Sequence, residues 1–145
     1  MFLIKSFRHA FEGIWFCIKH ERNFRIHLFA AATVFIIMPY FSLAEQEKIL
    51  ITIAVFLMLA LEMINTAFEV LVNFISPEYN INAKHIKDLS AGAVAMMAFG
   101  CLCVGTFVFW KPEALWAMLV DITGDVFKAM YAVVYIISGI MFIYL

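Results

Sequence analysis

Charged residues are scarce in this chain. They make up 14% of its 145 residues, whereas hydrophobic residues make up 66%. An ordinary soluble domain contains roughly 25% charged residues, because it needs polar side chains on its surface. The composition therefore excludes a soluble globular domain, and the wealth of apolar residues excludes intrinsic disorder. The net charge of −1 gives no support for nucleic-acid binding. The sequence predicts an integral membrane protein.

Cysteine and glycine-rich motifs are scarce as well. The three cysteines, Cys17, Cys101 and Cys103, are too few and odd in number for a disulfide framework. We interpret them as small buried hydrophobic residues. The sequence contains neither a GxxxxGK(S/T) nor a GxGxxG motif, so a conventional nucleotide-binding loop is absent.

Four apolar stretches come close to the ~20 residues that a helix needs to cross a membrane. They cover residues 26–41, 49–75, 91–110 and 126–145. In segment 1–25 the apolar residues recur at helical spacing, which is typical of an amphipathic helix on the membrane surface. We therefore expect an all-α integral membrane fold: an N-terminal amphipathic surface helix, a three-helix transmembrane core and a fourth, C-terminal transmembrane helix. A re-entrant or surface-lying helix is the alternative for the last stretch.

The distribution of lysine and arginine predicts the orientation in the membrane. Residues 1–25 contain five basic residues and loop 76–90 contains two, whereas the loops on the other side contain three in total. Short loops rich in basic residues stay on the cytoplasmic side. We therefore expect the N-terminus, loop 76–90 and the C-terminus to lie in the cytoplasm.

The most informative feature is a polar stripe in the second span. Glu62, Asn65, Glu69 and Asn73 are spaced by three or four residues, so they share one face of a helix. A carboxylate at mid-membrane costs ~2.5–3.5 kcal/mol even on the lenient insertion scale. At about 1.5 Å per residue, Glu62 lies below the headgroup level and Glu69 near the cytoplasmic edge. A buried carboxyl suits a general base, and an interfacial carboxylate suits a hard cation such as Mg²⁺.

Further charged residues flank this stripe on the predicted cytoplasmic side. Glu21 and Arg25 precede the first span, and Lys84, Lys87 and Asp88 precede the third. Such a set can hold a metal ion and a polyphosphate at a lipid surface. Residue types alone leave three hypotheses open: catalysis, an ion pathway, and structural pairing of buried charges. The four histidines lack the spacing of metal ligands, and we interpret them as interfacial or packing residues.

These motifs resemble those of the small integral-membrane lipid kinases of bacteria, the prokaryotic diacylglycerol kinases and the related undecaprenol kinases. The family signature runs approximately E-x-x-N-(S/T)-A-(I/F)-E, followed by A-K-x-x-K-D before the next span. The matching residues here are Glu62, Asn65, Thr66, Ala67, Phe68 and Glu69, then Ala83, Lys84, Lys87, Asp88, Ser90, Ala91, Gly92, Ala93 and Val94. An upstream match, most like the undecaprenol-kinase branch, comprises Glu21, Asn23, Arg25, Ile26 and His27.

The resemblance implies an enzyme of the bacterial inner membrane that transfers the γ-phosphate of MgATP to the hydroxyl of diacylglycerol or undecaprenol. It also implies a homotrimer whose active sites lie between subunits at the cytoplasmic interface. Glu62 is then the catalytic base, Glu21 and Glu69 bind Mg²⁺ and the nucleotide, and Lys87 contacts phosphate. The other residues implied at the nucleotide are Glu78, Tyr79, Asn80 and Asp88. Those implied to bind or support the lipid substrate are Asn65, Asn73, Arg25 and Ala91.

Two features depart from the family pattern. Asn73 stands where the signature usually has Asp, which removes a negative charge while keeping hydrogen bonding. Residues 1–110 correspond to the kinase domain, so residues 111–145 form an extension without a functional explanation. The alternative function is a non-catalytic membrane bundle, either a degenerate kinase or a transporter or partner subunit. An ion path is poorly supported, because residues 49–61 contain no charged side chain.

Overall fold

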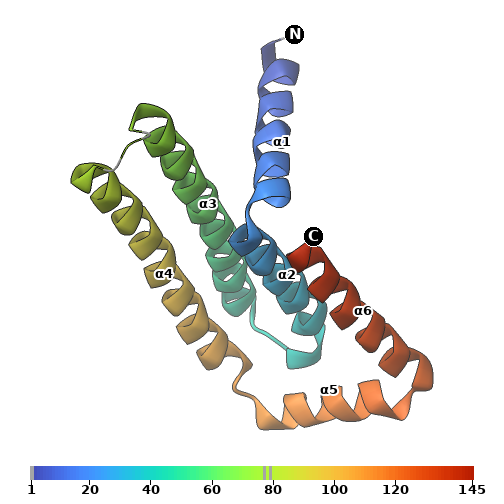
Figure 1. The fold of residues 1–145 in the computed structure, drawn as a ribbon. Helices are drawn as coiled ribbons and strands as arrows, with labels where there is room; N and C mark the ends of the chain where they lie inside the picture. Colours follow the sequence, from blue (N-terminus) through green and yellow to red (C-terminus); the bar gives the residue numbers. More distant parts are fainter. Residues whose placement is uncertain (1, 77, 79) are drawn as a thin grey trace.

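A computed structural model describes residues 2–76, 78 and 80–145, and this part of the chain is entirely helical. The elements, in chain order, are α1 (Phe2–His20), α2 (Arg22–Ile37), the 3-10 turn η1 (Met38–Phe41), α3 (Glu45–Ile75), α4 (Ile81–Phe109), α5 (Pro112–Gly124) and α6 (Val126–Tyr144) (Figure 1). The predicted all-α fold is therefore confirmed.

Four helical segments are long and apolar enough to cross a membrane: Arg22–Phe41, Glu45–Ile75, Ile81–Phe109 and Val126–Tyr144. They coincide with the four predicted stretches, including the C-terminal one. The third begins at Ile81, earlier than the apolar run itself. The side chain of Asn80 accepts hydrogen bonds from the backbone N–H groups of Asn82 and Ala83, which starts the helix within the polar loop sequence.

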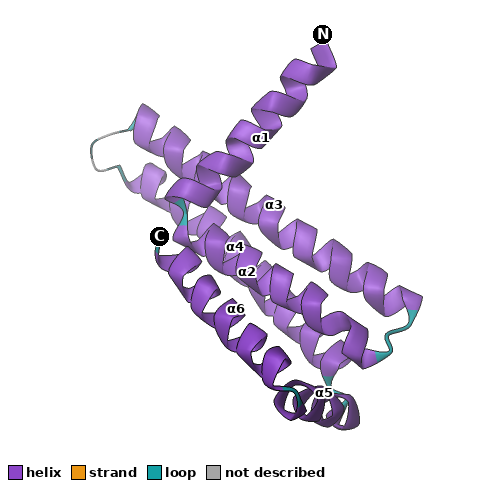
Figure 2. Ribbon diagram, turned by 90° about the vertical axis from the view of Figure 1, so that its right-hand side faces the viewer, coloured by secondary structure: helices purple, strands orange, loops and turns teal. Residues whose placement is uncertain are grey.

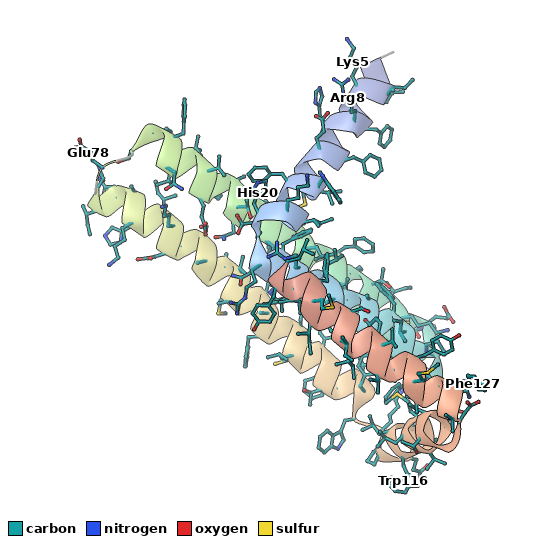
Figure 3. All side chains as sticks on the ribbon, turned by 45° about the vertical axis from the view of Figure 1, so that its right-hand side comes forward. Lys5, Arg8, His20, Glu78, Trp116 and Phe127 are labelled. Carbon is teal, nitrogen blue, oxygen red and sulfur yellow. The ribbon has the colours of Figure 1, made fainter. Side chains whose placement is uncertain are left out.

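The spans form an up-and-down bundle. α3 and α4 run side by side as a long hairpin, α2 packs on α3, and α6 packs antiparallel to α2 (Figures 1 and 2). Glu78 marks the tip of the α3–α4 connection, and we call this end of the bundle the site end (Figure 3). Trp116 on α5 marks the opposite end.

α1 leaves the bundle at a steep angle to the spans (Figure 2). Its large apolar side chains, among them Phe7, Phe11 and Trp15, are exposed along most of its length. An isolated apolar face of this size needs a lipid surface or a partner to cover it. A position on the membrane surface stays our prediction for α1.

The structure adds a helix that the sequence analysis did not predict. α5 begins with Pro112 at a first-turn position and Glu113 beside it, both favourable at a helix N-terminus. It lies across the opposite end of the bundle and contacts η1 and α6 (Figure 1). Its thirteen residues are too few to span a membrane.

α6 is held against α2 by close and specific contacts. Gly139 is buried against the Phe29 ring, and a Cβ atom at this position would overlap that ring. Phe29 also stacks on Tyr135 with ring centroids 5.0 Å apart, and the Thr33 and Tyr135 hydroxyls lie 2.9 Å apart. The C-terminal extension is therefore an integral part of the helix bundle.

Candidate active site

Glu62 lies in the middle of the bundle rather than at its surface. Glu62 is only 2% exposed, although other residues of α3 on either side of it are exposed. The nearest basic side chain is His27 of α2, whose Nε2 lies 3.1 Å from Glu62 Oε1. The angles at this contact are not those of a hydrogen bond, so Oε1 has no hydrogen-bond partner among the described residues. The carboxylate is thus buried and only loosely held.

Glu21 approaches the same region from the α1–α2 junction. It occupies the N-cap position of α2, yet its side chain makes no capping hydrogen bond. Burial, and secondly the negative charge of Glu69, raise the pKa of Glu21. The charges of Glu21 and Glu69 act on Glu62 as well. The structure therefore brings together the three acids that the sequence analysis selected, from two helices and a junction.

The charges of His20 and Arg25 act on Glu21 and oppose the effect of Glu69. In the described part of the chain, none of Glu21, Glu62 and Glu69 forms an ion pair with lysine or arginine. Within those same residues, no three metal-ligating side chains converge into a ready-made metal cage. Mg²⁺ does not need such a cage, because it is commonly held by one or two carboxylates together with substrate phosphates and water. Glu21 and Glu69 fit this mode of binding.

A polar network connects the stripe on α3 to α4. Ser90 Oγ donates to Asn65 Oδ1 at 2.7 Å, and Asn65 Nδ2 donates to Glu69 Oε1 at 3.1 Å. One turn further on, Lys87 Nζ donates to Asn73 Oδ1 at 2.7 Å. These bonds orient the Glu69 carboxylate and hold the Lys87 ammonium beside the stripe.

A polar pocket of about 300 Å³ lies where α3 and α4 meet at the site end. Its lining includes Asn73, Glu78, Asn80, Lys84 and Lys87. Three of the residues that the resemblance implies at the nucleotide, Glu78, Asn80 and Lys87, thus surround one cavity. A fourth, Tyr79, lies outside the described residues. The two lysines give the pocket the charge that phosphate groups require.

Three other predicted residues form no side-chain hydrogen bond or ion pair with these acids in the described part of the chain. Asp88 and Ala91 are exposed on α4. Arg25 is buried, and its guanidinium donates to the backbone carbonyls of Ile18, Lys19 and Ile143. Arg25 therefore ties the ends of α1 and α6 to α2.

His27 is the site residue whose contact the sequence analysis missed. The sequence alone favoured a packing role, because no second ligand-type residue stands at metal-binding spacing from it. The available signal was its place in the E-x-N-x-R-I-H match, six positions after Glu21. Only the packing of α2 on α3 reveals that His27 contacts Glu62.

The fold and the site define a class: a multi-pass helical membrane protein with an acidic centre and a phosphate-compatible pocket at one end. The chain belongs to the prokaryotic diacylglycerol kinase family, because the model of that family matches residues 8–109. It is accordingly an ATP-dependent lipid kinase. This membership supports the kinase hypothesis over an ion pathway or a non-catalytic bundle. The matched range ends at the last residue of α4, so α5 and α6 lie beyond it.

Individual relatives agree with the family assignment. The chain is 38% identical to an undecaprenol kinase of Bacillus subtilis over 105 residues, which is 72% of this chain and 85% of the relative. It is 32% identical to a diacylglycerol kinase of Synechocystis, covering 76% of this chain and 63% of that protein. A diacylglycerol kinase of Haemophilus influenzae is 29% identical, over 70% of this chain and 83% of its own length.

Proposed function

We propose that the chain transfers the γ-phosphate of MgATP to the hydroxyl of diacylglycerol or undecaprenol, with Glu62 as general base. The observation that carries this proposal is a group of three acids that form no ion pair with lysine or arginine in the described structure, together with a lysine-lined pocket further along α3. Carboxylates that lie close together without such pairs repel one another, and a bound cation would relieve this repulsion.

Glu21 and Glu69 are the residues that would hold Mg²⁺. Their carboxylates approach from the α1–α2 junction and from α3, and neither is used in an ion pair with lysine or arginine in the described structure. The chemistry that a bound Mg²⁺ supplies is neutralisation of charge on the phosphate oxygens. Asn65 keeps the Glu69 carboxylate in place through its amide N–H.

The nucleotide is assigned to the polar pocket between α3 and α4. Lys87 presents an ammonium group there, and Asn73 fixes it through a 2.7 Å hydrogen bond. Because phosphoryl transfer depends mainly on positioning and charge neutralisation, one fixed ammonium is of direct use. The Asn73 amide positions Lys87 without adding the negative charge that an aspartate would bring to the pocket.

In this proposal Glu62 accepts the proton of the lipid hydroxyl. As the hydroxyl oxygen forms its bond to the γ-phosphorus, the bond to the β–γ bridging oxygen breaks and ADP leaves with that electron pair. The hydroxyl proton goes to the Glu62 carboxylate. Burial of Glu62 suits this role, because a membrane lipid presents its hydroxyl below the aqueous phase.

We further propose that the site end faces the cytoplasm of a bacterial inner membrane. The asymmetry in lysine and arginine supports this orientation, and ATP is available on that side. We also propose a homotrimer with shared sites. Asp88 and Ala91 are exposed on α4 beside Lys87, so a neighbouring copy packed there would bring them into the site.

The proposal is tested with purified protein in lipid nanodiscs supplied with MgATP and either diacylglycerol or undecaprenol. We expect one of these alcohols to be phosphorylated, and Glu62→Gln to lower turnover by ~10²–10⁴-fold while sparing nucleotide binding. Glu113→Gln on α5 is the matched control, because this exposed acid lies at the opposite end. Normal turnover by Glu62→Gln would refute the base assignment, and absence of product with both alcohols would refute the substrate class.

A further inference from the structure

The contact between His27 and Glu62 joins two helices at the most buried acid of the protein. The Glu62 side chain is 3% exposed and that of His27 is 26% exposed. The 3.1 Å distance between His27 Nε2 and Glu62 Oε1 joins residues far apart in the sequence, since His27 lies in α2 and Glu62 in α3. Within the described chain, this is the ion-pair contact that Glu62 makes.

We propose that His27 is a positioning residue for the phosphoryl transfer: its Nε2, which lies 3.1 Å from Glu62 Oε1 without hydrogen-bond alignment, turns into line when the lipid binds and so fixes the carboxylate with its other oxygen toward the lipid hydroxyl. This inference rests on the proposed role of Glu62 as base. A carboxylate in a nonpolar environment needs a hydrogen-bond donor to hold one orientation, and a misplacement of about 1 Å costs roughly 10²-fold in rate.

The surroundings explain why His27 is needed for this task. The other acids near Glu62 are Glu21 and Glu69, which repel its charge rather than hold it. Thr66, one turn further along α3, gives its hydroxyl to the backbone carbonyl of Glu62 and not to the carboxylate. On α2, Arg25 is engaged by backbone carbonyls, which leaves His27, with Nε2 3.1 Å from Glu62 Oε1, as the residue that can orient the carboxylate.

His27 also connects Glu62 to a lipid-accessible surface. Its ring lines an apolar groove of about 710 Å³ along α2, α3 and α4, together with Met58, Cys101 and Phe109. The imidazole thus lies between the buried carboxylate and this apolar groove. A donor in this place holds the base at the boundary where a lipid hydroxyl arrives.

The test compares variants that differ in whether a donor reaches Glu62. His27→Gln places an amide N–H near the position of Nε2, whereas His27→Asn is polar but too short to reach. His27→Leu removes the donor and keeps an apolar side chain of moderate size. His85→Leu is the matched control, because His85 is an exposed histidine on α4. All four variants, with Glu62→Gln in parallel, are assayed for kcat and for KM of MgATP and of lipid.

We expect His27→Leu and His27→Asn to lower kcat by roughly 10–100-fold with both KM values within about twofold of the parent. His27→Gln should recover most of the loss, and His85→Leu should be unaffected. Equal kcat losses in His27→Gln and His27→Asn would overturn the positioning role, as would a normal kcat in His27→Leu while Glu62→Gln is inactive. Normal turnover by Glu62→Gln would instead overturn the base assignment, and this inference with it.

Discussion

The carboxylates at the opposite end of the bundle form ion pairs with lysines, whereas those of the candidate site do not. At the opposite end, acids are matched with lysines: Glu45 with Lys48 at 2.8 Å, Glu47 with Lys111 at 3.2 Å, and Asp121 with Lys128 at 2.6 Å. Between the middle of the bundle and the site end, Glu21, Glu62 and Glu69 act on one another without an ion pair to lysine or arginine in the described structure. Ion pairs thus neutralise acids at the opposite end, whereas the three acids of the candidate site repel one another.

This contrast also separates two kinds of packing. The opposite end has a compact apolar cluster in which Phe41 is 1% exposed and meets Phe109 edge to face. The site end is held by polar links, such as Ser90 to Asn65 and Lys87 to Asn73. Active sites commonly sacrifice stability in this way, because the groups that bind ligand are unsatisfied in its absence.

The largest effect is expected from removing a site-end acid. Glu69→Gln should lower turnover by at least ~10–100-fold, the loss typical even of outer-shell partners of a metal, and should raise the Mg²⁺ concentration for half-maximal rate. Its unfolding temperature should stay level or rise, because repulsion between Glu69 and Glu21 is relieved. Magnesium titration of initial rates and thermal unfolding measure both. A clear loss of stability without a change in Mg²⁺ dependence would break the contrast.

A second effect is expected where α6 joins the bundle. Gly139→Leu inserts a side chain into the Phe29 ring, and overpacking of this kind costs about 1–3 kcal/mol in the free energy of unfolding. Ile140→Leu is the control, since Ile140 is half exposed on the neighbouring face. Reversible unfolding of the membrane protein in mixed micelles measures the difference. Equal stability of the two variants would mean that α6 does not depend on this contact.

A smaller effect is expected from an acid at the opposite end. Glu47→Gln weakens the link to Lys111 and the hydrogen bond from the Ala44 N–H. The unfolding temperature should fall slightly, less so in high salt, because exposed ion pairs are weak and screened. Turnover should match that of the parent protein. An activity loss comparable to that of Glu69→Gln would contradict the division between the two ends.

The smallest effect is expected at Asp121, and it should depend on pH. Hydrogen bonds from Lys128 and then Tyr40 lower the pKa of Asp121 below its ordinary value of 3.8. A lowered folded-state pKa contributes stability that is present above 3.8 and is lost as pH falls through the folded pKa. Asp121→Asn should therefore lower the unfolding temperature slightly at pH 7, and the difference should shrink in acid. A difference that grows below pH 4 would contradict this sign.

Much of the fold followed from local sequence features. The four spans were predictable because a membrane-crossing helix satisfies its own backbone and needs only length and apolar side chains. The start of α4 at Ile81 was less visible, because an Asn80 cap extends that helix into polar sequence. α5 was missed because thirteen residues with mixed polarity look like a loop unless the Pro112 and Glu113 signals are weighed.

The candidate site likewise contains residues that the sequence predicted and contacts that it did not. Glu62, Asn65, Glu69 and Asn73 were recognisable because helical spacing places them on one face whatever the rest of the chain does. That Lys87 bonds Asn73, and that Ser90 bonds Asn65, required the pairing of α3 with α4. Periodicity within one helix carries no information about which residue of another helix it will meet.

The sequence by itself determined that this chain crosses a membrane and carries two acids on one face of its second span, because composition and period act locally. Only the tertiary structure decided that His27 contacts Glu62, that Arg25 donates hydrogen bonds to backbone carbonyls, and that α6 packs on α2 through Gly139. Those outcomes depend on how helices distant in sequence approach one another. That approach is set by side-chain packing across interfaces, which no single segment specifies.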